Sequence, residues 1–189
     1  MTLTIHPGAK QISPRSQGQL DSLCGLYALI NAIRVLHAPN HRITSNQCEL
    51  LFEAGIDALA AKLVSKSLAF GAMTVAEQGK LARILIKSPA LEGLPGVSVR
   101  PSLPRIKTID DLDELLFEAL SHGEIFLTCL LGRRTHHSVI VGATSSRIML
   151  FDSAGMQFVY KTSLRFDDAR SGALTITGLT PVGLRILPT

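Results

Sequence analysis

The spacing of apolar residues changes near Gly123, and this change restricts the possible fold more than any other feature of the chain. Before Gly123, apolar side chains recur every three or four positions, which is typical of helices that bury one face. After Gly123, short β-rich runs are separated by turns of Gly, Ser, Thr and Asp. Helices followed by strands with short connections predict an α+β fold, in which helices pack on an antiparallel sheet.

Four segments carry the helical period, and we expect helices over residues 22–37, 44–67, 74–87 and 108–121. The second and third segments begin with the spacing of a capping box, in which two side chains three positions apart bond each other's backbone N–H groups. These pairs are Thr44 with Gln47 and Thr74 with Glu77. Gly55 is expected to bend or break the second helix, because glycine is a poor helix former.

The expected strands are short. One covers residues 97–99, and the others follow Gly123 at 124–131, 137–141, 147–151, 158–161, 173–176 and 182–187. Short connections favour a meander, in which strands that are consecutive in the chain pair with each other. Residues 1–18 are expected to form an extended lead-in across the surface. We expect a single domain over 1–189, with a mainly helical part over 1–96 and a mainly antiparallel sheet over 97–189.

Composition and charge narrow the class of protein. Hydrophobic residues make up 46% and charged residues 18% of the chain, which is typical of a folded globular protein rather than a disordered one. The net charge of +4 is spread along the chain and Trp is absent, so nucleic acid is not an expected partner. No apolar run reaches the roughly 18 residues that a membrane span needs, so a membrane is not expected as a partner either.

The cysteines and the first residues bear on location. The three cysteines are widely spaced and form no CxxC pair, so neither a disulfide framework nor a zinc site is indicated. The first residues, Met-Thr-Leu-Thr-Ile-His-Pro-Gly, lack the regions of a signal peptide. We therefore expect a cytoplasmic protein without a cofactor. Export as an effector by a leaderless route and the oligomeric state are left open.

Cys24 stands at the start of the first expected helix, which continues with apolar residues at helical spacing and which Asp21 or Ser22 can cap. In a first helical turn, unsatisfied backbone N–H groups and the positive end of the helix dipole stabilise a thiolate. Cys24 is therefore a candidate nucleophile, and a small buried hydrophobic side chain is the alternative. Cys48 and Cys129 lie within apolar segments and are expected to be packing residues.

A cysteine nucleophile needs a base, a group that orients the base, and donors for the oxyanion. His137 begins an apolar run, and Asp152 closes the next one. In an antiparallel hairpin the start of one strand lies beside the end of the other, so we expect His137 and Asp152 to be hydrogen-bonded neighbours. Gln19, on the loop before Cys24, and the backbone N–H of Cys24 are the expected oxyanion donors.

Two other interpretations of these histidines remain. His136 and His137 can be polar residues at a strand start without any chemical role. A metal site formed by His136, His137, Asp152 and Cys24 has suitable ligand atoms, but the residues do not have the spacing of a metal-binding motif.

The order of these residues resembles that of a known superfamily. Gln-x4-Cys-Gly leads into a helix, and His-Ser-Val-Ile-Val-Gly and a strand that ends in Asp before a Gly turn follow much later. This order, from about Gln19 to Gly155, resembles the papain-like cysteine peptidases. The local Gln-x-x-Ser-Leu-Cys is similar to Josephin-type deubiquitinating peptidases, whereas Cys-Gly and the His-Ser-Val strand are more similar to bacterial double-glycine leader peptidases.

The resemblance implies a papain-like fold and a cysteine peptidase that hydrolyses a peptide or isopeptide bond of a protein or peptide substrate. It implies that Cys24 is the nucleophile, His137 the general base and acid, Asp152 the residue that orients the imidazole, and Gln19 the oxyanion donor. The same triad would serve a glutamine deamidase or a transglutaminase-type acyltransferase. A degenerate papain-like domain that binds a protein is a third interpretation.

The chain departs from the papain pattern in three respects. Papain has one more residue between its Gln and Cys, usually an Asn as third member of the triad, and a Trp that shields it. This chain has Asp152 as the third member and no Trp. Gln17 is therefore a rival for the oxyanion role, and His136 is a rival for the role of the base.

Overall fold

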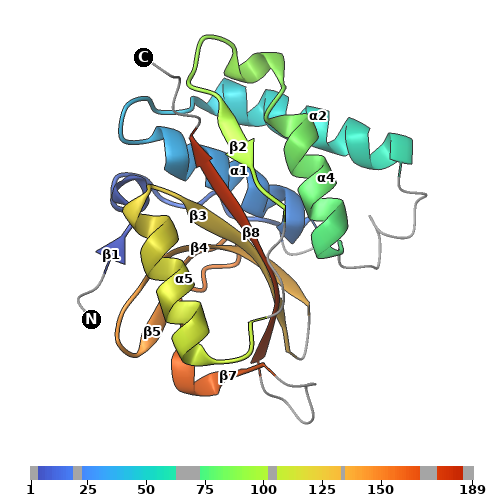
Figure 1. The fold of residues 1–189 in the computed structure, drawn as a ribbon. Coiled ribbons are helices and arrows are strands. Elements are labelled where there is room, and N and C mark those ends of the chain that lie inside the picture. Colours follow the sequence, from blue (N-terminus) through green and yellow to red (C-terminus); the bar gives the residue numbers. More distant parts are fainter. Residues whose placement is uncertain are drawn as a thin grey trace.

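The structure is a computed structural model, and it describes residues 4–18, 23–62, 73–101, 106–132, 135–166 and 174–184. Helices and an antiparallel sheet form the α+β fold that the sequence predicts (Figure 1). In chain order the elements are β1 (Thr4–Ile5), η1 (Pro7–Lys10), α1 (Cys24–His37), α2 (Ser45–Lys62), α4 (Val75–Leu85), η2 (Pro89–Leu91), β2 (Val97–Val99), α5 (Ile109–Ser121), β3 (Ile125–Leu131), β4 (His136–Ala143), β5 (Arg147–Phe151), β6 (Phe158–Tyr160), η3 (Lys161–Ser163), β7 (Leu164–Arg165) and β8 (Leu174–Leu184).

The described strands form one eight-stranded sheet with the order β2-β8-β3-β4-β5-β6, to which β1 adds on β4 and β7 adds on β8. Every pairing is antiparallel except that of β7 with β8. The expected meander is confirmed for β3 to β6. It is wrong for β8, which returns from the end of the chain to lie between β2 and β3 (Figure 1).

Strand β8 is continuous where the sequence predicts two strands, at 173–176 and 182–187. Pro181 suggests a break, because proline has no N–H to donate to a neighbouring strand. In β8, however, Pro181 O accepts a bond from Arg100 N (3.0 Å), just beyond the end of β2. The N and O of one strand residue point to the same side, so the missing N–H also faces away from β3. The pairing of β8 with β3 therefore continues past Pro181.

The helices follow the expected segments with differences at their ends. Helix α1 begins at Cys24, and Leu23 before it makes no side-chain cap bond. Asp21 and Ser22, the expected caps, lie outside the described residues. Both expected capping boxes form at the starts of α2 and α4, by Thr44 with Gln47 and by Thr74 with Glu77.

Helix α2 continues through Gly55, where the sequence predicts a bend or break. A Cβ at Gly55 would lie 2.3 Å from Leu26 Cδ1, so the absence of a side chain allows α1 and α2 to approach closely. The expectation is wrong because Gly55 serves helix packing instead of ending the helix. The expected extension of this helix beyond Lys62 lies outside the described residues.

The sheet separates two apolar cores. Successive side chains of a strand point to opposite faces, so Leu127 and Phe126, or Val139 and Ile140, belong to different cores. Helices α1, α2 and α4 cover the face that carries Leu127 and Val139, and α5 covers the other face. This arrangement places α1 against β4 and β3, with α5 on the opposite side of the sheet (Figure 1).

The lead-in before α1 is more structured than the extended segment that the sequence predicts. It contributes β1 to the sheet and forms the short helix η1, where a Cβ at Gly8 would lie 1.9 Å from Val35 O of α1. Residues 10–17, here called the strap, then run along α1 toward its N-terminus. Arg34 Nη1 donates to Ser13 O (2.9 Å), and further along the strap Arg15 bonds α1 as well.

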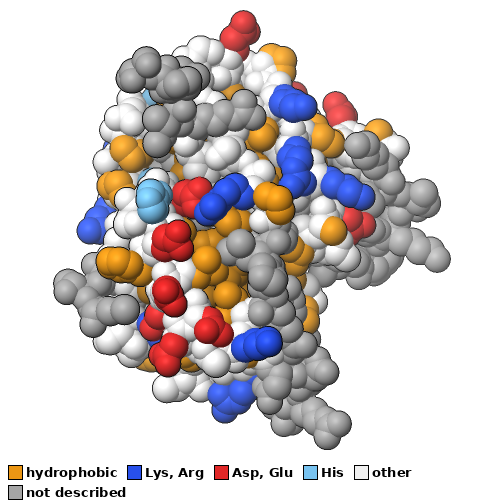
Figure 2. Space-filling view, in the orientation of Figure 1, with side chains coloured by type: hydrophobic (Ala, Val, Ile, Leu, Met, Phe, Trp, Pro, Cys, Tyr) orange, Lys and Arg blue, Asp and Glu red, His pale blue; other side chains and the backbone are white. Residues whose placement is uncertain are grey.

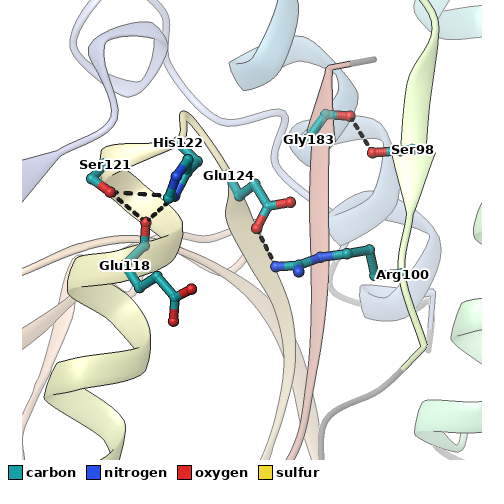
Figure 3. Close-up of polar contacts among 7 residues, drawn as sticks. All are labelled: Ser98, Arg100, Glu118, Ser121, His122, Glu124 and Gly183. Carbon is teal, nitrogen blue, oxygen red and sulfur yellow. Dashed lines mark hydrogen bonds and ion pairs between the residues drawn. The ribbon is translucent and has the colours of Figure 1, made fainter. Parts of the chain in front are cut away.

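Polar contacts hold the β2 edge of the sheet and the end of α5 (Figure 3). Ser98 Oγ donates to Gly183 O (3.2 Å), and Arg100 forms an ion pair with Glu124. At the C-terminus of α5, His122 Nδ1 lies 2.8 Å from Glu118 O. These contacts tie β2 to β8 and close the last turn of α5.

Charged side chains are unevenly distributed on the face seen in Figure 2. Acidic side chains gather over α5, and the first turns of this helix carry Asp110, Asp111, Asp113 and Glu114 in the sequence. Such residues stabilise a helix N-terminus. In the part of the chain that the structure describes, no helix combines the length and the apolar character that crossing a membrane requires.

Candidate active site

Cys24 is the first residue of α1 and is 7% exposed. Contacts with α4 and with Met73, which lies two residues before α4, fix this end of α1. Gln78 Nε2 donates to Gly25 O (3.3 Å), and a Cβ at Gly25 would lie 3.0 Å from Met73 Sδ. The glycine that follows Cys24 therefore allows Met73 to pack against the first turn. Backbone N–H groups in a first helical turn lack helical partners and can stabilise an anion at Cys24.

His136 and Asp152 come from the two strands of one hairpin. His136 is the first residue of β4, and Asp152 directly follows β5. His136 Nε2 lies 2.6 Å from Asp152 Oδ2; the aspartate side chain is fully buried and the histidine side chain is 18% exposed. Asp152 Oδ1 accepts bonds from Ala154 N (2.8 Å) and Met156 N (3.1 Å). The turn after β5 therefore fixes the carboxylate while its other oxygen holds the imidazole.

The electrostatics of the site favour a protonated His136. The hydrogen bond to Asp152, and after it the hydrogen bond to Cys24, raise the pKa of His136 to about 9 despite burial. Because Asp152 engages Nε2, Nδ1 is the ring nitrogen left for Cys24. Burial would raise the pKa of Asp152, but His136, the Ser138 hydroxyl and Met156 N–H together outweigh burial and lower it.

His137 lies on the opposite face of β4, and the expectation that it bonds Asp152 is wrong. Its Nε2 lies 2.5 Å from Met73 O, and the residue is fully buried. Burial is the main cause that lowers the pKa of His137, and the charge of His136 lowers it further. The hairpin brings the expected strand ends together, but neighbouring side chains on a strand point to opposite faces. His136, not His137, therefore faces Asp152.

The strand pattern holds a signal that favours His136. His137 alternates with Val139 and Val141, which form an apolar face toward the helices, whereas His136 alternates with the polar Ser138. An imidazole that must carry charge belongs on the more polar face. Sequence reasoning also missed the carbonyl of Met73 as the partner of His137, because that contact joins distant segments and leaves no local pattern.

Gln17 is the glutamine that the structure places beside the turn after Asp152. Gln17 N donates to Ser153 O (3.0 Å), and Ser153 Oγ donates to Gln17 Oε1 (3.1 Å). These bonds attach the end of the strap to the turn that fixes the carboxylate. Gln19, the expected oxyanion donor, lies outside the described residues, so its role stays a prediction.

The structure does not assemble the alternative metal site. His137 faces Met73, whereas His136 faces Asp152, so these side chains do not converge on one point. Within the six described ranges, no group of three or more His, Cys, Asp or Glu side chains is arranged to hold a metal ion.

Comparison with protein-family models, with curated proteins and with solved structures found no match to this chain.

The chemistry that the site can perform follows from its own atoms. The imidazole of His136 is hydrogen-bonded to the Asp152 carboxylate, and the Cys24 thiol acts on the same ring and raises its pKa. An imidazolium beside the sulfur stabilises a thiolate, and the same ring can return the proton to a leaving group. The carboxylate keeps the ring oriented and stabilises its charge. This arrangement suits nucleophilic attack on a carbonyl carbon through a covalent thioester.

Proposed function

We propose that this protein is a papain-like cysteine peptidase that hydrolyses a peptide or isopeptide bond in a protein or peptide substrate. In this proposal Cys24 is the nucleophile, His136 instead of His137 is the general base and acid, and Asp152 orients the imidazole. The observation that carries the proposal is that the imidazole ring of His136 is hydrogen-bonded to Asp152, while Cys24 also contributes to the raised pKa of that ring.

Acylation begins from a thiolate and an imidazolium. The Cys24 sulfur attacks the carbonyl carbon, and a C–S bond forms as the carbonyl oxygen becomes an oxyanion. The oxyanion collapses, the C–N bond breaks, and His136 donates its proton to the leaving amine. The products of this half-reaction are a free amine, a neutral imidazole and an acyl group held on Cys24 as a thioester.

Deacylation uses the same ring in the opposite direction. His136, now neutral, takes a proton from a water molecule, and the resulting hydroxide attacks the thioester carbon. The C–S bond breaks, the acid product leaves, and the thiolate and imidazolium are restored. Asp152 does not gain a proton in this scheme; it accepts the Nε2–H bond of His136 throughout.

The backbone N–H of Cys24 and a glutamine amide supply the oxyanion donors in this proposal. Gln19 and Gln17 are the candidates, and Gln17 is already bonded to Ser153 in the turn that follows Asp152. The order of elements supports a papain-like fold: a helix that starts at the nucleophile packs on an antiparallel sheet that supplies the base and the carboxylate.

The triad also suits a glutamine deamidase or a transglutaminase-type acyltransferase, in which the attacked amide is a side chain. A domain that only binds a protein has no need of a buried carboxylate that holds an imidazole against a thiol. A peptidase, a deamidase and an acyltransferase all transfer an acyl group from an amide to the thiol, and product analysis distinguishes these three reactions.

Incubation of the full chain with denatured protein substrates tests the proposal, with the Cys24→Ala and Cys129→Ala variants beside the wild type. Cys129 is also a buried cysteine, at 3% exposed, and it lies in β3 outside the candidate site, so it is the matched control. We expect new peptide amino termini from wild type and Cys129→Ala, and none from Cys24→Ala. An acid-quenched reaction should carry an acyl mass on the peptide that contains Cys24.

The products assign the reaction. New amino termini support the peptidase, whereas ammonia release without chain cleavage identifies a deamidase. Ammonia release together with incorporation of an added amine identifies an acyltransferase. Products from Cys24→Ala at the wild-type rate would contradict all three forms of thiol chemistry.

A further inference from the structure

Two hollows lie beside the strap, and Arg15 lines both of them. The basic hollow, named for the cations Lys10, Arg15, Arg34 and Arg42 in its lining, has a volume of about 560 Å³. The apolar hollow, which includes Tyr27, Ile30 and Phe52, has a volume of about 320 Å³ and lies between the strap and α2. We call the two hollows together the trough.

One face of α1 connects the trough with Cys24. Tyr27 lines the apolar hollow and Arg34 lines the basic hollow. Residues 24, 27, 31 and 34 follow the three- and four-residue spacing of a single helix face. With a rise of 1.5 Å per residue, Tyr27 lies about 5 Å and Arg34 about 15 Å along the helix axis from Cys24. The apolar hollow is therefore the nearer one to the nucleophile.

Among the residues that the structure describes, the lining of the basic hollow carries only positive charge. None of its described lining residues is Asp or Glu. The bonds of its arginines go to neutral groups: Arg34 to Ser13 O (2.9 Å), Arg42 to Gln11 O (3.3 Å) and Arg15 to Ser45 Oγ (2.7 Å). A concave site lined by one sign of charge attracts the opposite charge.

The cations of the basic hollow are held on a fixed backbone. Asn31 is fully buried, and its side chain forms two bonds with the strap: Arg15 N donates to Asn31 Oδ1 (2.8 Å), and Asn31 Nδ2 donates to Arg15 O (3.1 Å). Arg34 Nη1 also donates to Asn31 Oδ1 (3.2 Å). One buried amide therefore fixes the backbone of Arg15 and the guanidinium of Arg34, so less order is lost when an anion binds.

The apolar hollow has a different preference. The rings of Tyr27 and Phe52 lie 5.5 Å apart, measured between centroids, and offer an apolar surface. Glu49 and Glu53 line its α2 side and would repel an acidic side chain. An acidic group is therefore directed past the apolar hollow into the basic one.

We infer that the substrate is an extended peptide that places an apolar side chain in the apolar hollow and an acidic side chain in the basic hollow. This inference rests on the proposed peptidase function for its link to the cleaved bond. An extended chain advances about 3.3 Å per residue, so the 15 Å between Cys24 and Arg34 corresponds to about four or five residues. Acidic selectivity should thus appear four or five residues from the cleaved bond, and apolar selectivity one or two residues from it.

Internally quenched peptides that differ by a single Asp-to-Asn change at the distant position test the inference. The wild type should cleave the Asp peptide with a kcat/KM about tenfold higher than the Asn peptide. In the double variant Lys10→Gln/Arg42→Gln, this ratio should fall to about twofold or less. Raising NaCl from 50 to 500 mM should lower the wild-type ratio, because salt screens exposed charges.

The double variant Lys107→Gln/Arg165→Gln is the matched control, since it removes one Lys and one Arg that are also exposed but lie outside the trough. This control should keep the wild-type ratio. A ratio near one in the wild type, or an equal fall of the ratio in both double variants, would overturn the inference.

Binding measurements separate this inference from the peptidase proposal. Fluorescence anisotropy with the same peptides and the Cys24→Ala variant measures peptide binding to the trough in the absence of cleavage. Preferential binding of the Asp peptide that is lost in Lys10→Gln/Arg42→Gln would support the trough as a binding site, whether or not the wild type cleaves the peptide. Absence of cleavage by the wild type would contradict only the peptidase proposal. Tight binding of inorganic tripolyphosphate without any Asp preference would overturn the inference and identify a site for a compact anion.

Discussion

At the scale of single residues, two adjacent histidines have opposite roles. His136 faces Asp152 and Cys24, and these bonds raise its pKa to about 9. His137 faces Met73 O within the apolar core, where burial lowers its pKa. At neutral pH the first ring therefore carries charge beside the sulfur, whereas the second is a neutral donor that joins β4 to the start of α4.

Replacing His136 by Ala should slow the alkylation of Cys24. The imidazolium beside the sulfur stabilises the thiolate, which is the reactive form of cysteine. At pH 6 we expect iodoacetamide to modify Cys24 well before Cys48 and Cys129 in the wild type, and about tenfold more slowly in His136→Ala. Peptide mapping by mass spectrometry measures the rate at each cysteine in one sample.

His137→Gln is the matched control for this experiment. It should lower the free energy of unfolding by about 1–3 kcal/mol, because it disturbs a buried hydrogen bond. The alkylation rate of Cys24 should stay within about twofold of the wild type. Equal labelling of all three cysteines in the wild type would contradict an activated Cys24.

The raised pKa of His136 predicts a pH dependence of stability. Its value is about 9 in the folded protein and 6.5 in the reference state. The stabilisation from protonated His136 is therefore fully present below pH 6.5 and is lost as the pH rises through 9. We expect the free energy of unfolding to fall by about 1–3 kcal/mol between pH 6.5 and 9.5. Urea unfolding at both pH values measures the change.

Asp152→Asn should flatten this dependence, because it removes the largest cause of the raised pKa. The buried histidines whose pKa values are lowered, His6, His37 and His137, destabilise the folded protein only as the pH falls below 6.5. They leave the alkaline range unaffected. If the free energy of unfolding of Asp152→Asn fell with pH as steeply as that of the wild type, the pH effect would belong to another group.

The sequence is sufficient to place Cys24, Asp152 and the hairpin in the candidate site, but not to choose between the two histidines. Cys24 follows from the start of an apolar helix, Asp152 from a strand end before a Gly turn, and the hairpin from their spacing with the histidines. The choice between His136 and His137 depends on strand register, and a shift of one residue reverses the face. Register is set by contacts across the whole sheet, which no local pattern contains.

At the scale of elements, the strap links the N-terminal segment to the turn that follows Asp152. Gly8 packs against the backbone of α1, the strap then bonds Asn31 and Arg34, and Gln17 bonds Ser153. The position of Gln17 therefore depends on contacts made several residues earlier in the chain.

Gly8→Ala should destabilise the protein by about 1–3 kcal/mol and lower its activity. The added Cβ would lie 1.9 Å from Val35 O, a backbone atom that cannot move without shifting α1. Gly79→Ala is the matched control, because its Cβ meets only Arg83 Nη1 at 3.5 Å inside helix α4. The control should stabilise the protein by about 0.5–1 kcal/mol. Urea unfolding of both variants measures the change in the free energy of unfolding. A change of the same sign in both variants would contradict the assigned packing of Gly8.

Element boundaries could be predicted where local chemistry sets them. Thr44, Thr74 and Thr108 begin helices with side-chain caps, and the structure has helices at all three places. Predictions failed where a distant segment decides the outcome. Gly55 continues a helix because Leu26 fills the space beside it, and β8 passes Pro181 because β2 ends there.

At the scale of the whole molecule, the helices and the sheet share one core while α5 closes the other face. Cys48 lies in the helical layer and Cys129 in β3 at the centre of the sheet, and both are buried. Because the same apolar core joins both layers, we expect them to unfold together. The two cysteines are therefore natural probes of cooperativity.

Pulsed alkylation across a urea series should label Cys48 and Cys129 with the same midpoint, within about 0.2 M. The circular dichroism transition should have that midpoint as well. A Cys24→Ala background keeps the Cys24 thiol from contributing to the signal. Separate midpoints would show that the helical part and the sheet part unfold as distinct units, contrary to the expected single domain.

The long separation along the chain between Cys24 and its partners His136 and Asp152 has a consequence during translation. More than a hundred residues separate Cys24 from Asp152, and β3, which pairs with β4, also needs β8 at the end of the described chain. The Cys24 thiol therefore leaves the ribosome long before the β4–β5 hairpin can form. In the proposed peptidase, the growing polypeptide is thus protected from its own active site until β4, β5 and β8 have been synthesised.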